Sequence, residues 1–333
     1  MHDLSPRVLD ESTATGWLPK RVARGELTMS ELEVRSREGQ RIMRELEALP
    51  SLPCAVREMT ELDIDSPNFV EDVARIAEGD ASIARHILRI ANVDTPLPPE
   101  PIESIPEAVV HMGSRAVSEL TASISALRVF PPTSPEHVEL WQHANQVAVI
   151  AQDIAEDRSI GIDPQSAFLA GLLHDLGRFL LFEHDPQAIS EVSVHGWPTP
   201  SSLIAAERAA FGVQHADLGF KMCQQWGLAP AVCHIVRLHH TFGTSDEMLM
   251  PQVERCLPIV QQADHLSALL VRERGLLAMS FSDRRAIIGA HCMTTYRAPV
   301  SPPTRLAERL DIVVGRSREL LRDLGLGSSE PAG

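Results

Sequence analysis

The sequence predicts an all-α protein. Aromatic residues make up only 4% of its 333 residues, whereas β-sheets are enriched in aromatic and β-branched side chains. Apolar residues recur at intervals of three and four in several stretches, the spacing that places them on one face of a helix. No stretch shows a convincing strand pattern, and no internal repeat is evident. We therefore expect packed aliphatic helices.

The first part of the chain combines a polar extension with a helix that ends at prolines. Residues 1–35 are polar and only weakly periodic, so we expect an extension or a docked arm. A helical pattern starts at about residue 36 and runs into a segment containing Pro50 and Pro53. Proline removes a backbone donor and clashes with the preceding turn, so these residues should end the helix.

Two helices are expected within residues 67–92, each with a side chain that can cap its first turn. Asn68 or Ser66 can cap the first helix, and Asp80 can cap the second. These short polar side chains accept hydrogen bonds from the unpaired backbone N–H groups of a helix start. The pattern therefore predicts two consecutive, separately capped helices.

Prolines also divide the rest of the chain. Residues 95–101 are expected to be irregular, and a helix should run from Pro106 towards Leu127. The proline-rich segment 129–135 is the best candidate for a domain boundary. Beyond it we expect helices at about 136–158, 164–182, 200–211, 215–227, 230–240, 251–272 and 303–323. The helix over 251–272 should bend at Pro258.

The net charge and the cysteine content indicate in which compartment the protein works and which partners it does not bind. The formal net charge is −15, so nucleic acid is a poor default partner, since that affinity depends on Lys and Arg. The N-terminal residues contain no signal-peptide pattern, and no apolar run approaches 18 residues. The five cysteines are scattered without a CxxC pair, which is typical of a reducing compartment. We expect a cytoplasmic protein that does not bind membranes.

The second half contains polar residues that are costly to bury without partners. His174 and Asp175 lie together in a leucine-rich segment, and His143 precedes apolar residues on the same helical face. Imidazoles supply nitrogen ligands to transition metals, and a carboxylate can bridge two ions. Two such ions can clamp a phosphoryl oxygen and activate water. The predicted metal ligands are His143, His174, Asp175, His215, His239, His240 and Asp264.

A plainer interpretation stays open for each histidine. Lone histidines such as His86, His111 and His234 are more often satisfied core or surface residues than ligands. The alternative for the whole set is a degenerate site of hydrogen-bonded histidines without an ion, and retained metal binding is favoured over it. If a metal is held, we expect one or two divalent ions of iron, manganese or zinc.

The chain resembles proteins with an HDOD domain, a bacterial signalling branch of the HD superfamily of metal-dependent phosphohydrolases. The resemblance covers about residues 45–265. It is carried by several motifs, which are Leu49-Pro50-Ser51-Leu52-Pro53, Asp80 to Asn92, Ile105 to Gly113, Ala170-Gly171-Leu172-Leu173-His174-Asp175-Leu176-Gly177, Phe211 to Gly219, and Trp226-Gly227-Leu228 with His239-His240. It implies two helical lobes with the HD-type site in the second. The expected parts are an extension (1–35), an N-terminal lobe (36–133), an HD-like lobe (134–297) and a C-terminal helix with a tail (298–333).

Two positions depart from related enzymes. Cyclic-dinucleotide phosphodiesterases of this superfamily carry an acidic residue and Gly-Tyr-Pro after the paired histidines, whereas this chain continues with Thr241-Phe242-Gly243. Hydrolysis of cyclic di-GMP is therefore disfavoured. The usual lysine after His-Asp-x-Gly is Arg178 here, which keeps the charge and changes the donor geometry.

Two functions follow as hypotheses. The favoured one is a signalling protein that binds a protein partner or a small phosphorylated ligand and is not itself catalytic. The alternative is a metal-dependent phosphohydrolase acting on a nucleotide or another phosphate ester, with Asp175 and Arg178 as catalytic residues. DNA binding through a helix-turn-helix is opposed by the charge.

Overall fold

The computed structural model describes residues 29–49, 57–59, 61–92, 102–194, 200–242, 249–295 and 300–326. All regular structure within these ranges is helical, which confirms the all-α prediction. The longer helices are α2 (Met29–Glu47), α4 (Phe69–Gly79), α5 (Ala81–Ala91), α6 (Ile105–Met112), α7 (Ser114–Val129), α8 (Pro135–Ala155), α9 (Pro164–Leu173), α10 (Leu176–His184), α11 (Pro186–Val194), α12 (Pro200–Phe211), α13 (His215–Gln225), α14 (Pro230–Leu238), α15 (Pro251–Arg272), α16 (Phe281–Thr295) and α17 (Pro303–Asp323).

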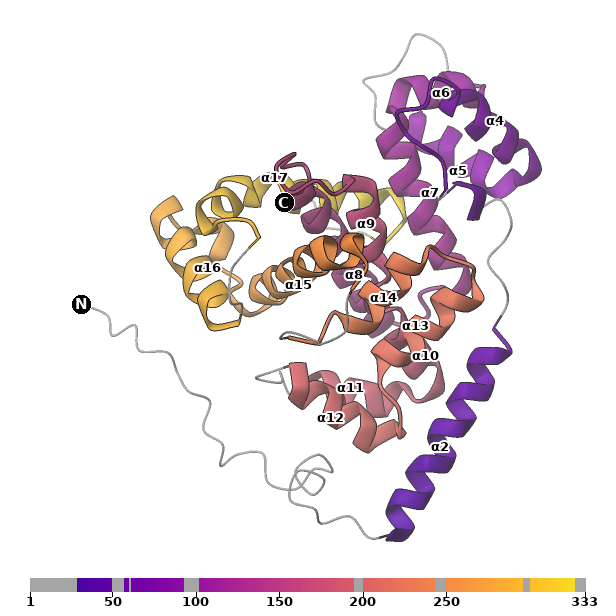
Figure 1. Cartoon of the computed structure of the whole chain (residues 1–333). Helices are drawn as coiled ribbons and strands as arrows, with labels where there is room; N and C mark the ends of the chain where they lie inside the picture. The colour runs from indigo at the N-terminus through magenta and orange to yellow at the C-terminus, as the bar shows by residue number, and fades with distance from the viewer. Residues whose placement is uncertain are drawn as a thin grey trace.

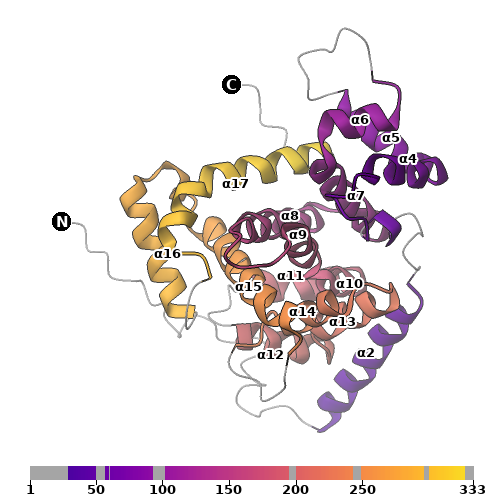
Figure 2. The same cartoon turned by 45° about the horizontal axis from the view of Figure 1, so that its top comes forward.

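The helices form two lobes joined by α7. Helices α4, α5 and α6 group at one end of the molecule, and α7 leads from them into the larger group (Figures 1 and 2). The smaller lobe has its own core, built around residues such as Val73, Ile83 and Val117. Leu120 and Ile124, further along α7, belong to the larger core. The two-lobed architecture is therefore present.

Helix α2 contributes to the larger core although its sequence precedes the smaller lobe. Ile42 and Leu46 of α2 are buried among the side chains of the larger lobe. The helix begins at Met29, earlier than the expected start at about residue 36. The exact division of the chain at residue 133 stays a prediction.

Local capping explains where several helices begin. The Asp80 carboxylate accepts a hydrogen bond from the Ile83 N–H at 3.2 Å, as predicted. Ser134 accepts one from the His137 N–H at the start of α8, and Asp163 accepts one from Ser166 at the start of α9. Such caps satisfy backbone donors that the helix itself leaves unpaired. Helices α12, α15 and α17 have the predicted limits.

Two helices that we expected to be continuous are broken. The predicted helix from Pro106 to Leu127 is divided at Gly113, whose φ of 82° lies in the left-handed region that favours glycine. The predicted helix over 164–182 is divided between Leu173 and Leu176. Helices α11 and α16 were not predicted.

Helix α17 is anchored to the larger lobe by ion pairs with the buried Asp153. Arg309 of α17 lies 2.5 Å from the carboxylate of Asp153 on α8, and Arg305 lies 3.9 Å from it. Leu306, Leu310 and other apolar residues of α17 join the larger core. The C-terminal helix is therefore an integral part of this lobe.

Some predictions concern residues outside the described ranges. These are residues 1–28, the prolines 50 and 53, the irregular segment 95–101 and the end of the tail. Among the helices that are described, none is both long enough and apolar enough to cross a membrane.

Candidate metal centre

Two close helix contacts position the second-half polar residues. A Cβ on Gly171 of α9 would lie 2.9 Å from the Cα of Ala148 on α8, so these two helices meet backbone to backbone. A Cβ on Gly177 of α10 would lie 2.0 Å from the carbonyl oxygen of His215, at the start of α13. Side chains larger than hydrogen would force these helices apart. The two glycines therefore permit the approach of α8, α9, α10 and α13.

The break between α9 and α10 coincides with His174 and Asp175. His174 still has helical backbone angles, whereas Asp175 has φ −98° and ψ 14°. Consecutive residues of an unbroken helix point about 100° apart. The break changes this relation, and both side chains face one group of polar residues. We predicted this pair within a continuous helix, so that part of the prediction was wrong.

The first group of side chains consists of His143, His174 and Asp264, from α8, the end of α9 and α15. Asp264 Oδ1 lies 3.2 Å from His143 Nε2 and 3.9 Å from His174 Nε2. The three potential ligand atoms lie within 4.8 Å of one another. This is a spacing that a single cation could span.

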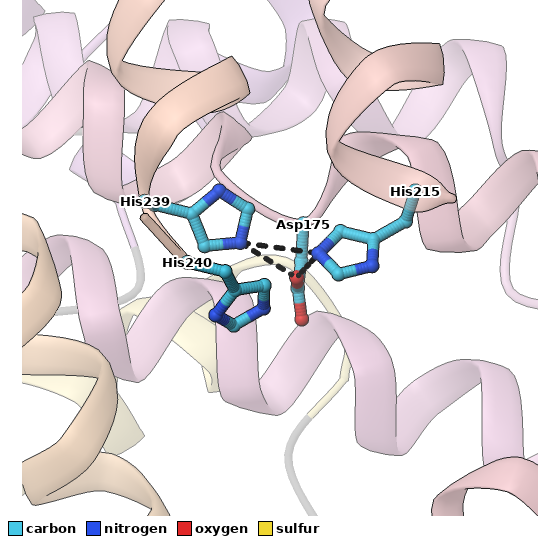
Figure 3. A group of neighbouring side chains, drawn as sticks. All are labelled: Asp175, His215, His239 and His240. Atoms are coloured by element: carbon cyan, nitrogen blue, oxygen red, sulfur yellow. Dashed lines mark hydrogen bonds and ion pairs between the residues drawn. The ribbon is translucent and has the colours of Figure 1, made fainter. Parts of the chain in front are cut away.

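The second group consists of Asp175, His215, His239 and His240 (Figure 3). Asp175 Oδ1 lies 3.2 Å from His215 Nε2 and 3.5 Å from His239 Nε2. Its other oxygen, Oδ2, lies 3.8 Å from His143 Nε2 and 3.7 Å from His174 Nε2. The Asp175 carboxylate therefore lies between the two groups, with one oxygen towards each. The structure brings together all seven residues predicted as ligands.

Hydrogen bonds at Nδ1 orient the rings of two histidines. His174 Nδ1 donates to the Gly171 carbonyl at 2.7 Å, and His239 Nδ1 donates to the Val236 carbonyl at 2.7 Å. A carbonyl only accepts, so Nδ1 of each ring carries a proton, and Nε2 is the nitrogen that is free to bind a metal. These Nε2 atoms face the site, which is the form in which histidine binds metals.

The other two Nδ1 atoms have side-chain acceptors. His215 Nδ1 donates to the Glu207 carboxylate at 2.5 Å. The Ser267 hydroxyl donates to Gln146 at 2.7 Å, so its oxygen accepts from His143 Nδ1 at 3.0 Å. Four rings thus point Nε2 towards the Asp175 carboxylate, held by partners on their far side. Such outer partners are a regular feature of metal-binding histidines.

Electrostatics favour neutral imidazoles at His174 and His240, beside ionised carboxylates at Asp175 and Asp264. Burial lowers the pKa of His174 to about 4, and burial with the neighbouring His239 holds the pKa of His240 well below 6.5. Burial alone would raise the pKa of Asp175 and Asp264, but the neighbouring histidines, and Arg178 in the case of Asp175, hold the pKa of both carboxyls well below the usual value. A buried pair of carboxylates in this state attracts cations.

For His143 and His215, burial acts to lower the pKa, but adjacent carboxylates outweigh it and raise the pKa of both. A metal ion would replace those protons.

Unpartnered buried atoms fit a cation at this site. Among the described residues, His174 Nε2 and both ring nitrogens of His240 are buried without a hydrogen-bond partner. His215 Nε2 and His239 Nε2 lie 3.1 Å apart. Two lone pairs at that distance need a proton or a cation between them. The donor set of imidazole nitrogens and carboxylate oxygens is the one that divalent transition metals prefer.

The prediction omitted Glu207 and Ser267, which hold ligand histidines from behind. Glu207 is fully buried on α12 and accepts hydrogen bonds from both the backbone N–H and the ring of His215. Its only signal in the sequence is a glutamate among alanines, between Ala206 and Ala209. Arg178 lies beside the site, 3.4 Å from Asp175 Oδ2. Of the histidines interpreted as ordinary, His234 packs against the Phe220 ring.

Comparison with known proteins identifies the family of the chain. The model of the HDOD domain matches residues 49–242, more than half of the chain. An uncharacterised protein of Treponema pallidum is 25% identical over 215 residues, which are 62% of this chain and 40% of that protein. Ribonuclease Y of Aquifex aeolicus is 29% identical over 126 residues, 38% of this chain. The matched part spans only 16% of that enzyme.

Solved structures share the fold. A candidate phosphohydrolase of Shewanella amazonensis has a TM-score of 0.63 at 20% identity, covering 85% of this chain and 97% of that one. An HDOD protein of unknown function from Geobacter sulfurreducens has a TM-score of 0.61 at 21% identity, covering 88% and 99%. A candidate signal transduction protein of Marinobacter aquaeolei has a TM-score of 0.59 at 23% identity, covering 85% and 60%. The family model matches more than half of the chain, and this match shows that the chain belongs to the HDOD-domain family.

Proposed function

We propose that this chain is a signal-transduction regulator whose larger lobe binds two divalent transition-metal ions. The observation that carries the proposal is the position of Asp175. Its Oδ1 faces His215 and His239, and its Oδ2 faces His143 and His174. A carboxylate placed in this way can bridge two cations. His143, His174 and Asp264 would hold one ion, and His215, His239 and His240 the other.

The regulatory part of the proposal is supported by the fold and its relatives. A structure with the same fold is described as a candidate signal transduction protein. The smaller lobe has an independent hydrophobic core and contributes none of the seven ligands. We propose that this lobe works with the metal lobe to recognise a protein partner or a small phosphorylated ligand.

Hydrolysis of a phosphate ester is the second candidate, favoured by the same shared carboxylate. Two bound divalent ions would supply Lewis acidity to a phosphoryl group. The chain's own residues would hold the ions and orient the site through the Nδ1 hydrogen bonds described above. His143 is the most exposed of the four Asp175-facing histidines, at 22% of its side chain, so a ligand would approach from its side of the centre.

Metal analysis of the purified chain tests the proposal. Wild-type protein, produced without a histidine tag, should contain close to two equivalents of iron, manganese or zinc. The Asp175→Ala variant should lose most of this metal, because the carboxylate between the two groups is gone. Asp65→Ala is the control, since Asp65 is exposed in the smaller lobe.

Two results would decide against the metal centre. One is a folded wild-type protein that contains little metal and does not bind added ions. The other is equal metal content in the wild type and in Asp175→Ala. If metal binds, a screen with phosphate monoesters and diesters separates the two candidate functions, because a regulator would show no turnover with either class.

A further inference from the structure

Arg178 and Glu207 form a closed ring with two of the predicted metal ligands. Arg178 Nη1 lies 3.4 Å from Asp175 Oδ2. Arg178 Nε lies 3.9 Å from Glu207 Oε1, which is an ion-pair distance and too long for a hydrogen bond. Glu207 Oε2 accepts from His215 Nδ1 at 2.5 Å, and His215 Nε2 lies 3.2 Å from Asp175 Oδ1. The ring therefore runs from Asp175 through Arg178, Glu207 and His215 back to Asp175.

The members of the ring are withdrawn from solvent. The Glu207 and His215 side chains are fully buried, and only 14% of the Arg178 side chain and 7% of the Asp175 side chain are exposed. Charges at this depth are retained in a fold only when they are paired. Here both carboxylates contact the Arg178 guanidinium and the His215 ring.

Arg178 suits this place better than a lysine would. A guanidinium presents donors in a rigid planar fork and can contact two carboxylates in different directions, whereas an ammonium is a compact point charge. Its neighbour Gly177 permits the backbone approach of α10 to His215, whose ring donates to Glu207. The same guanidinium thus links the start of α10, beside Asp175, with Glu207 of α12.

We propose that Arg178 and Glu207 are positioning residues of the metal centre, and that Arg178 acts through Asp175 and Glu207 rather than on a phosphate ligand. Glu207 holds the His215 ring with Nε2 towards the site. Arg178 holds both carboxylates at the separation that this requires. The inference rests on the proposed metal-binding function.

The test measures Co²⁺ binding to metal-free protein, by competition with a coloured chelator and by the visible absorption of bound Co²⁺. Glu207→Gln should weaken Co²⁺ binding about 10- to 100-fold, the range found for outer partners of ligand histidines. It should also shift the Co²⁺ absorption bands. Arg178→Lys should weaken binding to a smaller extent. The double variant should lose less than the product of the single losses, because both residues act through one ring and their effects are coupled.

Asp217→Asn is the matched control. It makes the same acid-to-amide change on α13, the helix of His215, at a half-exposed side chain that pairs with Gln214. It should leave Co²⁺ affinity and spectrum unchanged. Thermal unfolding of each metal-free variant separates positioning from folding, because a merely structural role would lower the unfolding temperature without changing affinity or spectrum.

Three outcomes would overturn the inference. Unchanged Co²⁺ affinity and spectrum in Glu207→Gln and Arg178→Lys would show that neither residue positions the site, while the proposed metal centre would stand. Loss of inorganic phosphate binding in Arg178→Lys, with Co²⁺ binding unchanged, would assign Arg178 to ligand contact. Failure of the wild type itself to bind Co²⁺ would remove the proposed metal centre together with this inference.

Discussion

His137 is buried among aromatic rings at the start of α8, outside the metal centre. Its ring stacks on Phe182 with centroids 4.6 Å apart and packs against Phe179. Its Nδ1 lies 3.4 Å from the Thr133 hydroxyl and 3.9 Å from Glu183. Among the described residues, Nε2 has no hydrogen-bond partner. Burial lowers the pKa of this histidine below the ordinary value of 6.5.

This shift makes stability depend on pH. Because the folded-state pKa lies below the unfolded one, the unfolded chain binds the proton more readily. The free energy of unfolding should therefore fall as the pH decreases from about 6.5 towards the folded-state pKa. In His137→Phe, the fall in unfolding temperature between pH 7.5 and pH 5.5 should be smaller than in the wild type, as measured by circular dichroism.

The exposed His111→Phe serves as the control for this measurement and should retain the wild-type pH dependence. The comparison concerns the slope with pH, so a constant packing cost of the new ring does not affect it. An identical slope in His137→Phe and the wild type would show that His137 does not contribute.

At the scale of elements, the site depends on how closely helices approach. Helices α10 and α13 meet through backbone at Gly177, where a Cβ would lie 2.0 Å from the His215 carbonyl oxygen. Helix α17 contains a glycine in the opposite situation, because nothing lies within 4 Å of a Cβ placed on Gly315. Replacing each of these glycines by alanine separates the cost of overpacking from the gain in helix propensity.

Gly177→Ala should destabilise the protein by about 1–3 kcal/mol, the usual cost of overpacking. It should also weaken metal binding, since His215 would move relative to Asp175. Gly315→Ala should instead stabilise the protein by about 0.5–1 kcal/mol, because alanine is the better residue in a helix interior. Urea unfolding of the metal-free proteins measures both changes in the free energy of unfolding. Equal effects of the same sign would contradict this account of Gly177.

At the scale of the whole molecule, a network of charges joins three helices from different parts of the sequence. Arg316 of α17 bonds to Gln152 of α8 and lies 3.3 Å from Glu119 of α7. Arg309 contacts Asp153, of which only 2% of the side chain is exposed. Burial raises the pKa of Glu119, although Arg316 acts against it. Helix α7, which joins the two lobes, is thus connected with the C-terminal helix α17.

A double-mutant cycle on Asp153 and Arg309 should give a coupling free energy of about 1–3 kcal/mol, because a paired charge with little solvent around it is weakly screened. The variants are Asp153→Ala, Arg309→Ala and their combination, compared by urea unfolding. The exposed pair Arg41 and Glu45 on α2, 3.2 Å apart, is the control and should give about 0.2–0.5 kcal/mol. Similar couplings for the two pairs would mean that burial does not strengthen the Asp153 interaction.

The sequence determined what depends on neighbouring residues. The all-α class follows from apolar spacing, and the starts of α5, α8 and α9 follow from Asp80, Ser134 and Asp163, because a cap acts within one turn. The candidate metal ligands could also be predicted, because adjacent polar residues in a leucine-rich segment need polar partners once they are buried.

Only the tertiary structure decided which atoms meet. The break at His174 and Asp175, the bridging position of the Asp175 carboxylate and the role of Glu207 arise from contacts between helices far apart in the sequence. A buried glutamate among alanines has no local pattern that distinguishes it from a surface one. The physical reason is that caps and apolar periodicity act within a few residues, whereas burial and ion pairing depend on the packed molecule.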